Sequence, residues 1–186
     1  FMCHVPMLSI PGVLGTSIDN IPGEIPYLTA DPDLVEKWRE SLSEIEGCKI
    51  GIAWQGNPDF KQDKFRSIPL SRFSELLDIE GARFISLQKG FGEEQIQKLE
   101  RPERLMVLEN VDTDEGAFMD TAAILGHLDL FITSDSAIAH LAGALGIPTW
   151  LILPYAPDWR WFLKREDTPW YPSMRLFRQT EFNCWD

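Results

Sequence analysis

Short apolar runs alternate with polar segments along most of this 186-residue chain. The runs are too short for helices and resemble strands buried on both faces of a sheet. Between them, apolar residues recur at helical spacing, as at Leu34, Trp38 and Leu42. We expect strands over residues 49–54, 83–87, 105–108, 128–132, 149–153 and 174–177. We expect helices over residues 33–45, 69–77, 93–99, 116–125, 135–145 and 157–164, with a polar loop over 55–68. This alternation predicts an α/β fold: a Rossmann-like parallel sheet with helices on both faces.

The first 31 residues depart from this pattern because prolines and glycines interrupt them throughout. We expect no helix there, since proline removes a backbone donor and glycine favours turns. The segment is nevertheless apolar, which indicates an extended linker that crosses a protein surface. We therefore predict a linker over residues 1–31 from a preceding N-terminal domain, a Rossmann-like domain over 32–180, and a tail over 181–186.

The composition narrows the possible functions. The chain is 44% hydrophobic and carries a net charge of −12, which argues against non-specific binding to nucleic acid or an anionic membrane. Its apolar runs are shorter than the roughly 20 residues that span a bilayer. Cys3, Cys48 and Cys184 are isolated and the histidines are scattered, so we expect no metal site and reduced thiols in a cytoplasmic protein.

The most informative polar turn follows the strand expected at 128–132. Asp135 suits an N-cap there, and Ser134, Ser136, Ala137 and His140 surround the start of the next helix. Free N–H groups at such a helix start bind phosphate. The alternative interpretation, a capped core helix with a buried histidine, is about equally supported by this turn alone.

A second polar turn follows the strand expected at 49–54. Gln55 and Asn57 lie in this turn, and Lys61, Lys64 and Arg66 follow within a few positions. Lysine and arginine would neutralise a diphosphate that the acidic body of the protein would otherwise repel. The alternative is a solvated surface loop, but a basic cluster in so acidic a chain favours a binding role.

Three further groups are weaker candidates. Gln88 and Lys89 follow the strand at 83–87, although a plain turn explains Lys89 somewhat better. Asp120, near a helix start, would suit ribose hydroxyls, but aspartate also stabilises helix starts by itself. In the aromatic tail after residue 153, we expect most rings to pack in the core and Trp159 and Arg160 to lie at a rim.

Taken together, these motifs resemble a known family. Residues 49–58 (KIGIAWQGNP), 66–70 (RSIPL), 85–89 (ISLQK) and 133–149 (TSDSAIAHLAGALGIPT) look like the C-terminal part of bacterial tetratricopeptide-repeat glycosyltransferases. These enzymes are related to heptosyltransferases and more distantly to O-GlcNAc transferases. The resemblance covers about residues 1–180 and implies the C-terminal half of a GT-B fold, in which two Rossmann-like domains face each other across a cleft.

The resemblance also implies a function for the site residues. It places Lys64 and Arg66 at the diphosphate of a nucleotide sugar, Asp120 near the ribose, and residues 134–137 with His140 along the phosphate and sugar. It implies that the catalytic base belongs to the preceding domain, so we assign none in this chain.

Our leading hypothesis from the sequence is the donor-binding domain of a metal-independent, inverting glycosyltransferase with no cofactor. Its partners would be a nucleoside-diphosphate sugar and a saccharide, lipid-linked or protein acceptor, with self-association through the face left open by the absent domain. Two alternatives stay open: a non-catalytic nucleotide-binding or interaction module, and a domain related to sugar epimerases.

Overall fold

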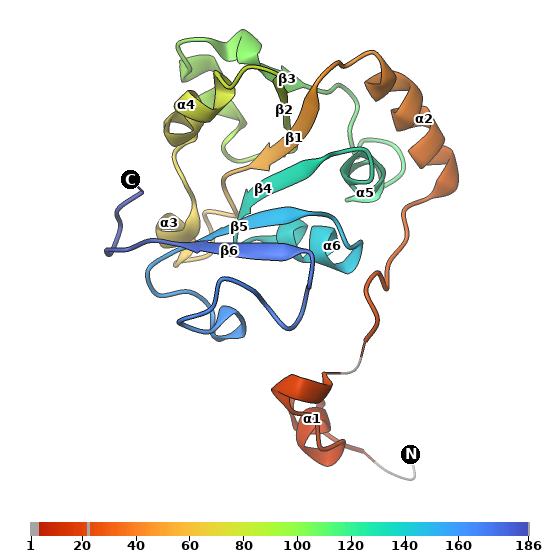
Figure 1. Cartoon of the computed structure of the whole chain (residues 1–186), viewed down its shortest axis with the longest axis vertical. Coiled ribbons are helices and arrows are strands. Elements are labelled where there is room, and N and C mark those ends of the chain that lie inside the picture. The colour runs from red at the N-terminus through yellow and green to blue at the C-terminus, as the bar shows by residue number, and fades with distance from the viewer. Residues whose placement is uncertain (1–3, 22, 186) are drawn as a thin grey trace.

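A computed structural model describes residues 4–21 and 23–185 of the chain, and its centre is one six-stranded parallel sheet (Figure 1). The strands are β1 (Cys48–Ala53), β2 (Ala82–Ser86), β3 (Leu105–Val107), β4 (Leu130–Ser134), β5 (Thr149–Leu153) and β6 (Met174–Arg178). Their order is β3-β2-β1-β4-β5-β6, so the direction of strand addition reverses between β1 and β4. This is the Rossmann-like arrangement that the sequence predicts.

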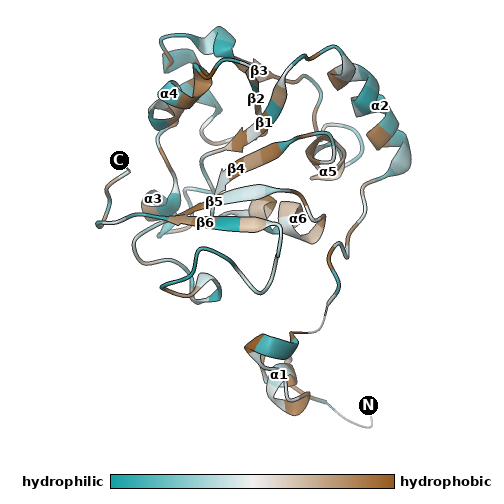
Figure 2. Ribbon diagram, in the orientation of Figure 1, coloured by the Kyte–Doolittle hydropathy of each residue, from teal (hydrophilic) through white to brown (hydrophobic). Residues whose placement is uncertain are grey.

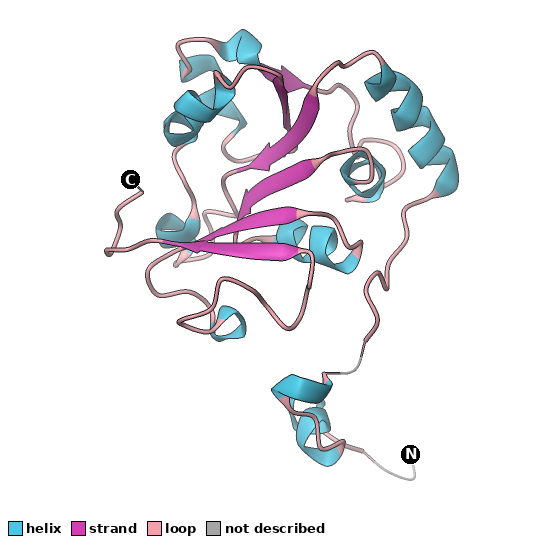
Figure 3. Ribbon diagram, in the orientation of Figure 1, coloured by secondary structure: helices cyan, strands magenta, loops and turns pink. Residues whose placement is uncertain are grey.

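Helices cover the two faces of the sheet (Figure 3). The α-helices of the sheet domain are α2 (Pro32–Ser43), α3 (Asp63–Arg66), α4 (Ser74–Leu77), α5 (Met119–Leu125) and α6 (Ala137–Ala144). Short 3₁₀ helices span Leu70–Phe73, Glu93–Lys98, Pro102–Arg104 and Trp159–Trp161. Helices α2, α5 and α6 lie on one side of the sheet, while α3 and α4 lie on the other (Figure 1).

Helix α2 shows how the sequence fixes its own boundaries. The carboxylate of Asp31 accepts hydrogen bonds from the N–H groups of Asp33 (2.9 Å) and Leu34 (3.3 Å), which caps the helix. Pro32 occupies the first turn, where a missing N–H costs nothing. Leu34, Trp38 and Leu42 are buried, as their spacing predicts. The helix therefore packs one apolar stripe onto the domain and leaves the other side in solvent.

The hydrophobic core has two layers, one on each face of the sheet. Under α2, α5 and α6 it includes Trp38, Ile85, Ile124 and Phe131, and the opposite layer is built around Trp54. A third cluster, around the fully buried Trp161, fills the space between α6 and strands β5 and β6. Figure 2 shows the hydrophobic colour concentrated on β4 and α5, at the centre of the domain.

The N-terminal segment differs from its prediction. We expected no helix in residues 1–31, but α1 (Ile10–Val13) and two 3₁₀ helices, Met7–Ser9 and Ile18–Asn20, form there. The expectation was wrong because Pro11 lies in the first turn of α1, where proline is tolerated. This helical segment extends away from the sheet domain in Figure 1. Residues 1–3 and 22, also part of the predicted linker, lie outside the described residues.

Several element boundaries also differ. The loop predicted over 55–68 contains the short helix α3, and the helix predicted over 157–164 is reduced to the 3₁₀ turn Trp159–Trp161. Helix α5 begins at Met119 instead of residue 116 because Phe118 adopts a left-handed conformation, with φ of 68°. All six predicted strands are present, within two residues of their expected ends.

Two further sequence expectations concern membrane-spanning segments and the cysteines. No helix in the described part of the chain has the length and apolar character needed to cross a membrane. Within residues 4–21 and 23–185 no disulfide joins Cys48 to Cys184, while Cys3 lies outside the described residues.

Candidate functional site

The site lies where the strand order reverses, at the carboxyl ends of β1 and β4. These two strands are paired in parallel, with Ile52 opposite Ile132 and Ala53 opposite Thr133. Their arrowheads point toward the same side of the domain, where α3 lies (Figure 1). The loops that follow β1 and β4 therefore face each other across a crevice, which is the usual place for a ligand in an open parallel sheet.

A buried carboxylate holds Arg66 in the loop after β1. Asp63 is only 3% exposed, and its Oδ1 accepts a hydrogen bond from Arg66 Nε at 3.0 Å. Its Oδ2 accepts a 2.6 Å bond from the hydroxyl of Ser67, which in turn accepts one from the N–H of Gly56. A side chain on Gly56 would collide with Asp63 and Arg66. Arg66 is therefore fixed by its neighbours, with its guanidinium 4.8 Å from the ring centre of Phe60.

The loop after β4 supplies the opposite wall. Ser134 and Asp135 are buried, and α6 begins after Ser136, whose extended backbone (φ −142°, ψ 178°) is that of an N-cap. The prediction that Asp135 caps this helix was wrong, because the cap position falls one residue later. The Ser136 side chain makes no capping hydrogen bond. The Ser136 side chain thus leaves the N–H groups at the start of α6 to other partners, and Ser136 and Ala137 line the crevice at the positive end of the helix dipole.

Asp135 lies beside this helix start in an unusual environment. Burial raises the pKa of its carboxyl group, although the indole N–H of Trp161 and the charges of His140 and Arg66 oppose the rise. Trp161 Nε1 is buried and forms no hydrogen bond of ordinary geometry with any described residue. The hydroxyl of Ser134 is likewise buried without a partner in the described part of the chain. Of these two buried groups, only the Trp161 indole belongs to a residue that lines the crevice.

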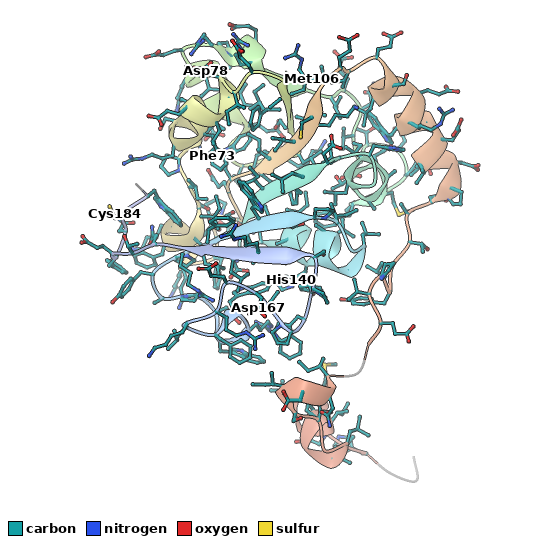
Figure 4. All side chains as sticks on the ribbon, in the orientation of Figure 1. Phe73, Asp78, Met106, His140, Asp167 and Cys184 are labelled. Carbon is teal, nitrogen blue, oxygen red and sulfur yellow. The ribbon has the colours of Figure 1, made fainter. Side chains whose placement is uncertain are left out.

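His140 lies one turn along α6, among aromatic rings. Its Nδ1 is 3.1 Å from the hydroxyl of Tyr171, and its ring stacks on Trp161 with centroids 5.3 Å apart. Burial lowers the pKa of His140, partly opposed by Asp135, so the neutral ring is favoured. Figure 4 labels His140 on α6, on the side of the domain where the C-terminal loops lie.

Two adjoining cavities open along this crevice, and we call them together the main cleft. One, of about 490 Å³, is lined by Asp135, His140, Asp158 and Arg160 among others. The other, of about 330 Å³, is lined by the turn after β1 and by the strand end near Gln88. Arg66, Ser136 and Ala137 line both cavities and form their common wall. The cation and the helix start that the sequence singled out are thus brought together.

The remaining residues of the second cavity have mixed roles. Gln88 is buried, and its amide is fully used: Oε1 accepts from the N–H groups of Trp54 and Gln55, and Nε2 donates to the carbonyls of Gln55 and Phe91. This amide clamps two loops together. Lys89 Nζ donates to the carbonyl of Val111 at 2.6 Å. The side-chain oxygen of Gln55 accepts a hydrogen bond from the side-chain amide of Gln95. Asn57 is exposed, and its Oδ1 accepts a hydrogen bond from the N–H of Asp59.

Three predicted site residues line neither cavity of the main cleft: Ser134, which is buried, Lys64 and Asp120. Lys64 is exposed on α3, with its ammonium group 4.8 Å from the ring centre of Phe65. Asp120 is 1% exposed and accepts hydrogen bonds from Lys37 Nζ (3.0 Å), Trp38 Nε1 (2.7 Å) and the N–H of Asp112 (2.9 Å). Its carboxylate joins α5 to α2 and is fully engaged there.

Sequence reasoning missed Asp63, Phe60 and Asp158. Asp63 gives no local signal, because only the folded loop shows that it is buried against Arg66. Asp158 does carry a local signal, because aspartate is a common residue at the start of a helical turn. In the structure it precedes the turn Trp159–Trp161 and accepts a hydrogen bond from the N–H of Arg160 at 3.0 Å. Among residues 4–21 and 23–185, no three histidine, cysteine or acidic side chains gather as metal ligands would.

Comparison with known proteins defines the class of fold. No protein-family profile matches the sequence. The structure resembles E. coli ADP-heptose LPS heptosyltransferase II (TM-score 0.62, 17% identity) over 87% of this chain and 48% of that one. It resembles a family 9 glycosyltransferase from Veillonella parvula DSM 2008 equally well (TM-score 0.62, 16% identity), over 94% of this chain and 48% of the other. The chain thus has the fold of one heptosyltransferase-like domain of a GT-B glycosyltransferase.

Two further proteins are similar to this chain. E. coli heptosyltransferase WaaC, solved with ADP-2-deoxy-2-fluoro heptose, matches over 90% of this chain and 46% of that one (TM-score 0.54, 16% identity). Protein FlbA of Caulobacter vibrioides (strain ATCC 19089 / CIP 103742 / CB 15) is 31% identical over 163 residues, which are 86% of this chain and 27% of FlbA. The chain therefore spans about a quarter of FlbA and about half of each matched structure.

Proposed function

We propose that this chain is the donor-binding domain of an inverting glycosyltransferase. It would bind a nucleoside-diphosphate sugar, whose sugar is transferred to an acceptor hydroxyl without a metal or another cofactor. The fold shared with heptosyltransferases supports the class of reaction. The geometry of the main cleft supports the ligand.

One observation carries the proposal: Arg66 and the start of α6 form a common wall between two cavities. A guanidinium group and free N–H groups at a helix start are both strong binders of phosphate oxygens. Each lies at the carboxyl edge of the sheet, in a protein whose net charge is −12. A diphosphate is the anion that suits a binding site bounded by two such elements.

The cavities on either side of this wall suit the two ends of the donor. We place the nucleoside in the cavity near Gln55, where Phe91 and Phe118 offer partly exposed rings. We place the sugar beside Asp135 and His140, whose polar groups match hydroxyls. The bound donor would then extend along the whole main cleft.

The chemistry follows from this placement. The acceptor oxygen forms a bond to the anomeric carbon while the bond from that carbon to the phosphate oxygen breaks, and the electron pair leaves with the diphosphate. Arg66 and the dipole of α6 would stabilise this departing charge. Attack from the face opposite the leaving group inverts the anomeric configuration. We assign no residue of this chain as the base that takes the acceptor proton.

Calorimetric titration with ADP, UDP and GDP tests the donor site. We expect at least one of them to bind, and Arg66→Gln to weaken its binding about tenfold, because a charge-assisted contact to phosphate is lost. Lys64→Gln is the matched control: it removes the same charge from the same helix but lies outside the main cleft.

The control variant should bind within about twofold of the parent chain, since an exposed charge acts weakly through solvent. Absence of binding by all three nucleotides at millimolar concentration would refute the proposed function. Equal losses in the two variants would show that only the overall charge of α3 matters and would refute the assigned role of Arg66.

A further inference from the structure

A third cavity of about 700 Å³ adjoins the main cleft, and we call it the aromatic pocket. One wall is the N-terminal segment that contains Ile25 and Tyr27, and the other is the loop that contains Trp159 and Trp170. His140 and Arg160 line both this pocket and the main cleft. The aromatic pocket therefore begins where we place the donor sugar and extends away from the nucleoside.

The N-terminal wall is held firmly to the domain. The N–H groups of Tyr27 and Leu28 both donate to the carbonyl of Ala144 at the end of α6, at 3.0 and 3.3 Å. Ile25 packs against the cluster around Trp161. The segment thus leaves the helical region around α1 and becomes part of the sheet domain before it reaches α2.

The opposite wall is anchored by one buried residue. Trp161 is fully buried, which fixes the adjacent Trp159 and Arg160 at the surface. Asp158 Oδ1 accepts hydrogen bonds from the N–H of Arg160 and from its Nη1 at 2.7 Å, and Trp170 Nε1 donates to the Arg160 carbonyl at 2.8 Å. Trp159 itself is 67% exposed and meets Trp170 edge to face, with centroids 6.5 Å apart. The Arg160 guanidinium lies over the Trp159 ring, 5.0 Å from its centre, and the remaining surface of this exposed indole is presented to solvent by a well-fixed loop.

The chemistry of the aromatic pocket suits a sugar ring. Indole and phenol faces pack against the C–H face of a pyranose, while the Tyr27 hydroxyl, His140 and Arg160 offer hydrogen bonds to its hydroxyl groups. No carboxylate lines the pocket among the described residues. A nucleotide fits it less well, because no start of an α-helix among the described residues lines this pocket to bind phosphate.

We propose that the aromatic pocket binds a pyranose ring of the acceptor saccharide, beside the donor sugar. This inference rests on the proposed function, since the donor must lie in the main cleft for the order of the two sugars to hold. Trp159 would be the stacking platform and Arg160 the polar group at the boundary between the two sites.

Indole N–H signals in NMR spectra of the full chain provide the test. Cellobiose, maltose and chitobiose are titrated separately, with sorbitol as a polyol that has no ring face. We expect saturable shifts with at least one disaccharide and none with sorbitol. Trp159→Ala should weaken the binding of that disaccharide about tenfold, as expected for the loss of one stacking ring. Trp150→Ala is the matched control, a partly exposed tryptophan on β5 that contacts Phe177 outside the pocket.

The two proposals are separated by a nucleotide titration of the same samples. Trp159→Ala should bind nucleotide as the parent chain does, because Trp159 does not line the main cleft. If nucleotide binds but none of the three disaccharides gives a saturable shift, the acceptor assignment is overturned and the donor site stands. Equal weakening by Trp150→Ala would also overturn it. A chain that binds no nucleotide refutes the proposed function instead.

Discussion

At the scale of single residues, two buried carboxylates organise their surroundings in different ways. Asp63 is paired with Arg66, which lines the main cleft, so this carboxylate positions a proposed ligand-binding cation. Asp120 instead joins two helices through Lys37, Trp38 and Asp112. Burial by itself would raise the pKa of Asp120, but these hydrogen bonds outweigh it and hold the pKa below its usual value. The charged form of Asp120 thus stabilises the folded chain.

Removal of Asp120 should therefore destabilise the fold. We expect Asp120→Ala to lower the free energy of unfolding by about 3 kcal/mol, because buried donors lose their acceptor. Urea unfolding at pH 7 measures this. Asp167→Ala, which removes an exposed partner of Arg165, is the control and should have little effect.

The same residue gives a dependence on pH with a defined sign. The pKa of the Asp120 carboxyl is lower in the folded chain than in the unfolded chain, where it is about 3.9. The stabilisation from this carboxylate is therefore complete above about pH 3.9, and it is lost as the pH falls through the pKa of the folded state. The parent chain should therefore lose stability more steeply below about pH 4 than Asp120→Asn. Identical acid slopes in the two proteins would contradict this account of Asp120.

Residue-level prediction from sequence succeeds where the chemistry is local. Ser136, Ala137 and Arg66 could be identified because each follows a strand end, and strand ends of a parallel sheet share one edge. Lys64 could not be separated from Arg66, because the short helix α3 that turns them apart carries no apolar pattern. Asp120 and Gln88 looked like ligands in the sequence, whereas their side chains are occupied by contacts to segments distant in the chain.

At the scale of elements, the connection between β1 and α3 shapes the site. Gly56 lies against Asp63 and Arg66 so closely that no side chain fits. The hydrogen bond from its N–H to Ser67 joins the start of the loop to its end. The compact loop thus depends on a residue without a Cβ atom, at a position where the backbone itself is not in the left-handed region.

A methyl group at this position should disturb the loop and leave the sheet intact. We expect Gly56→Ala to weaken nucleotide binding about fivefold, since Arg66 must shift to make room. Gly126→Ala, at the end of α5, serves as the control because an added Cβ there would meet only a carbonyl oxygen at 3.4 Å. Calorimetry compares the two, and unchanged affinity in Gly56→Ala would argue against a fixed Arg66.

The strands were more predictable than the helices for a physical reason. Strands β1, β2 and β4 are mostly buried and therefore largely apolar, and all six predicted runs form strands, including the partly exposed edge strands β3 and β6. Short helical turns such as Trp159–Trp161 depend on caps and on a single anchor, so no periodicity marks them. Phe118 delays the start of α5 through a left-handed backbone conformation that its residue type does not predict.

At the scale of the whole molecule, the N-terminal residues divide into two parts. Residues 4–20 are exposed apart from a half-buried Thr16, whereas Ile21, Gly23, Ile25 and Tyr27 line the aromatic pocket. The predicted linker over residues 1–31 thus contacts the sheet domain from about residue 21 onward. Proline and glycine content marked an irregular chain but gave no sign of where it attaches.

Truncation distinguishes the two parts. Deletion of residues 1–20 should change the free energy of unfolding by less than about 1 kcal/mol, because residues 4–20 bury little surface. Deletion of residues 1–28 should lower it by more and abolish the saccharide response, since the hydrogen bonds to Ala144 and one pocket wall are lost. Thermal unfolding and the disaccharide titration report the two effects, and equal destabilisation by both deletions would contradict this division.

The shared walls of the three cavities have a thermodynamic consequence. His140 and Arg160 each face both the main cleft and the aromatic pocket, so neither can adjust to one occupant without changing what it offers the other. Linkage then requires reciprocity: whatever factor a bound nucleotide sugar applies to the affinity for the second sugar, that sugar applies to the nucleotide sugar in return. His140 and Arg160 would thus determine whether the two substrates bind cooperatively or compete with each other.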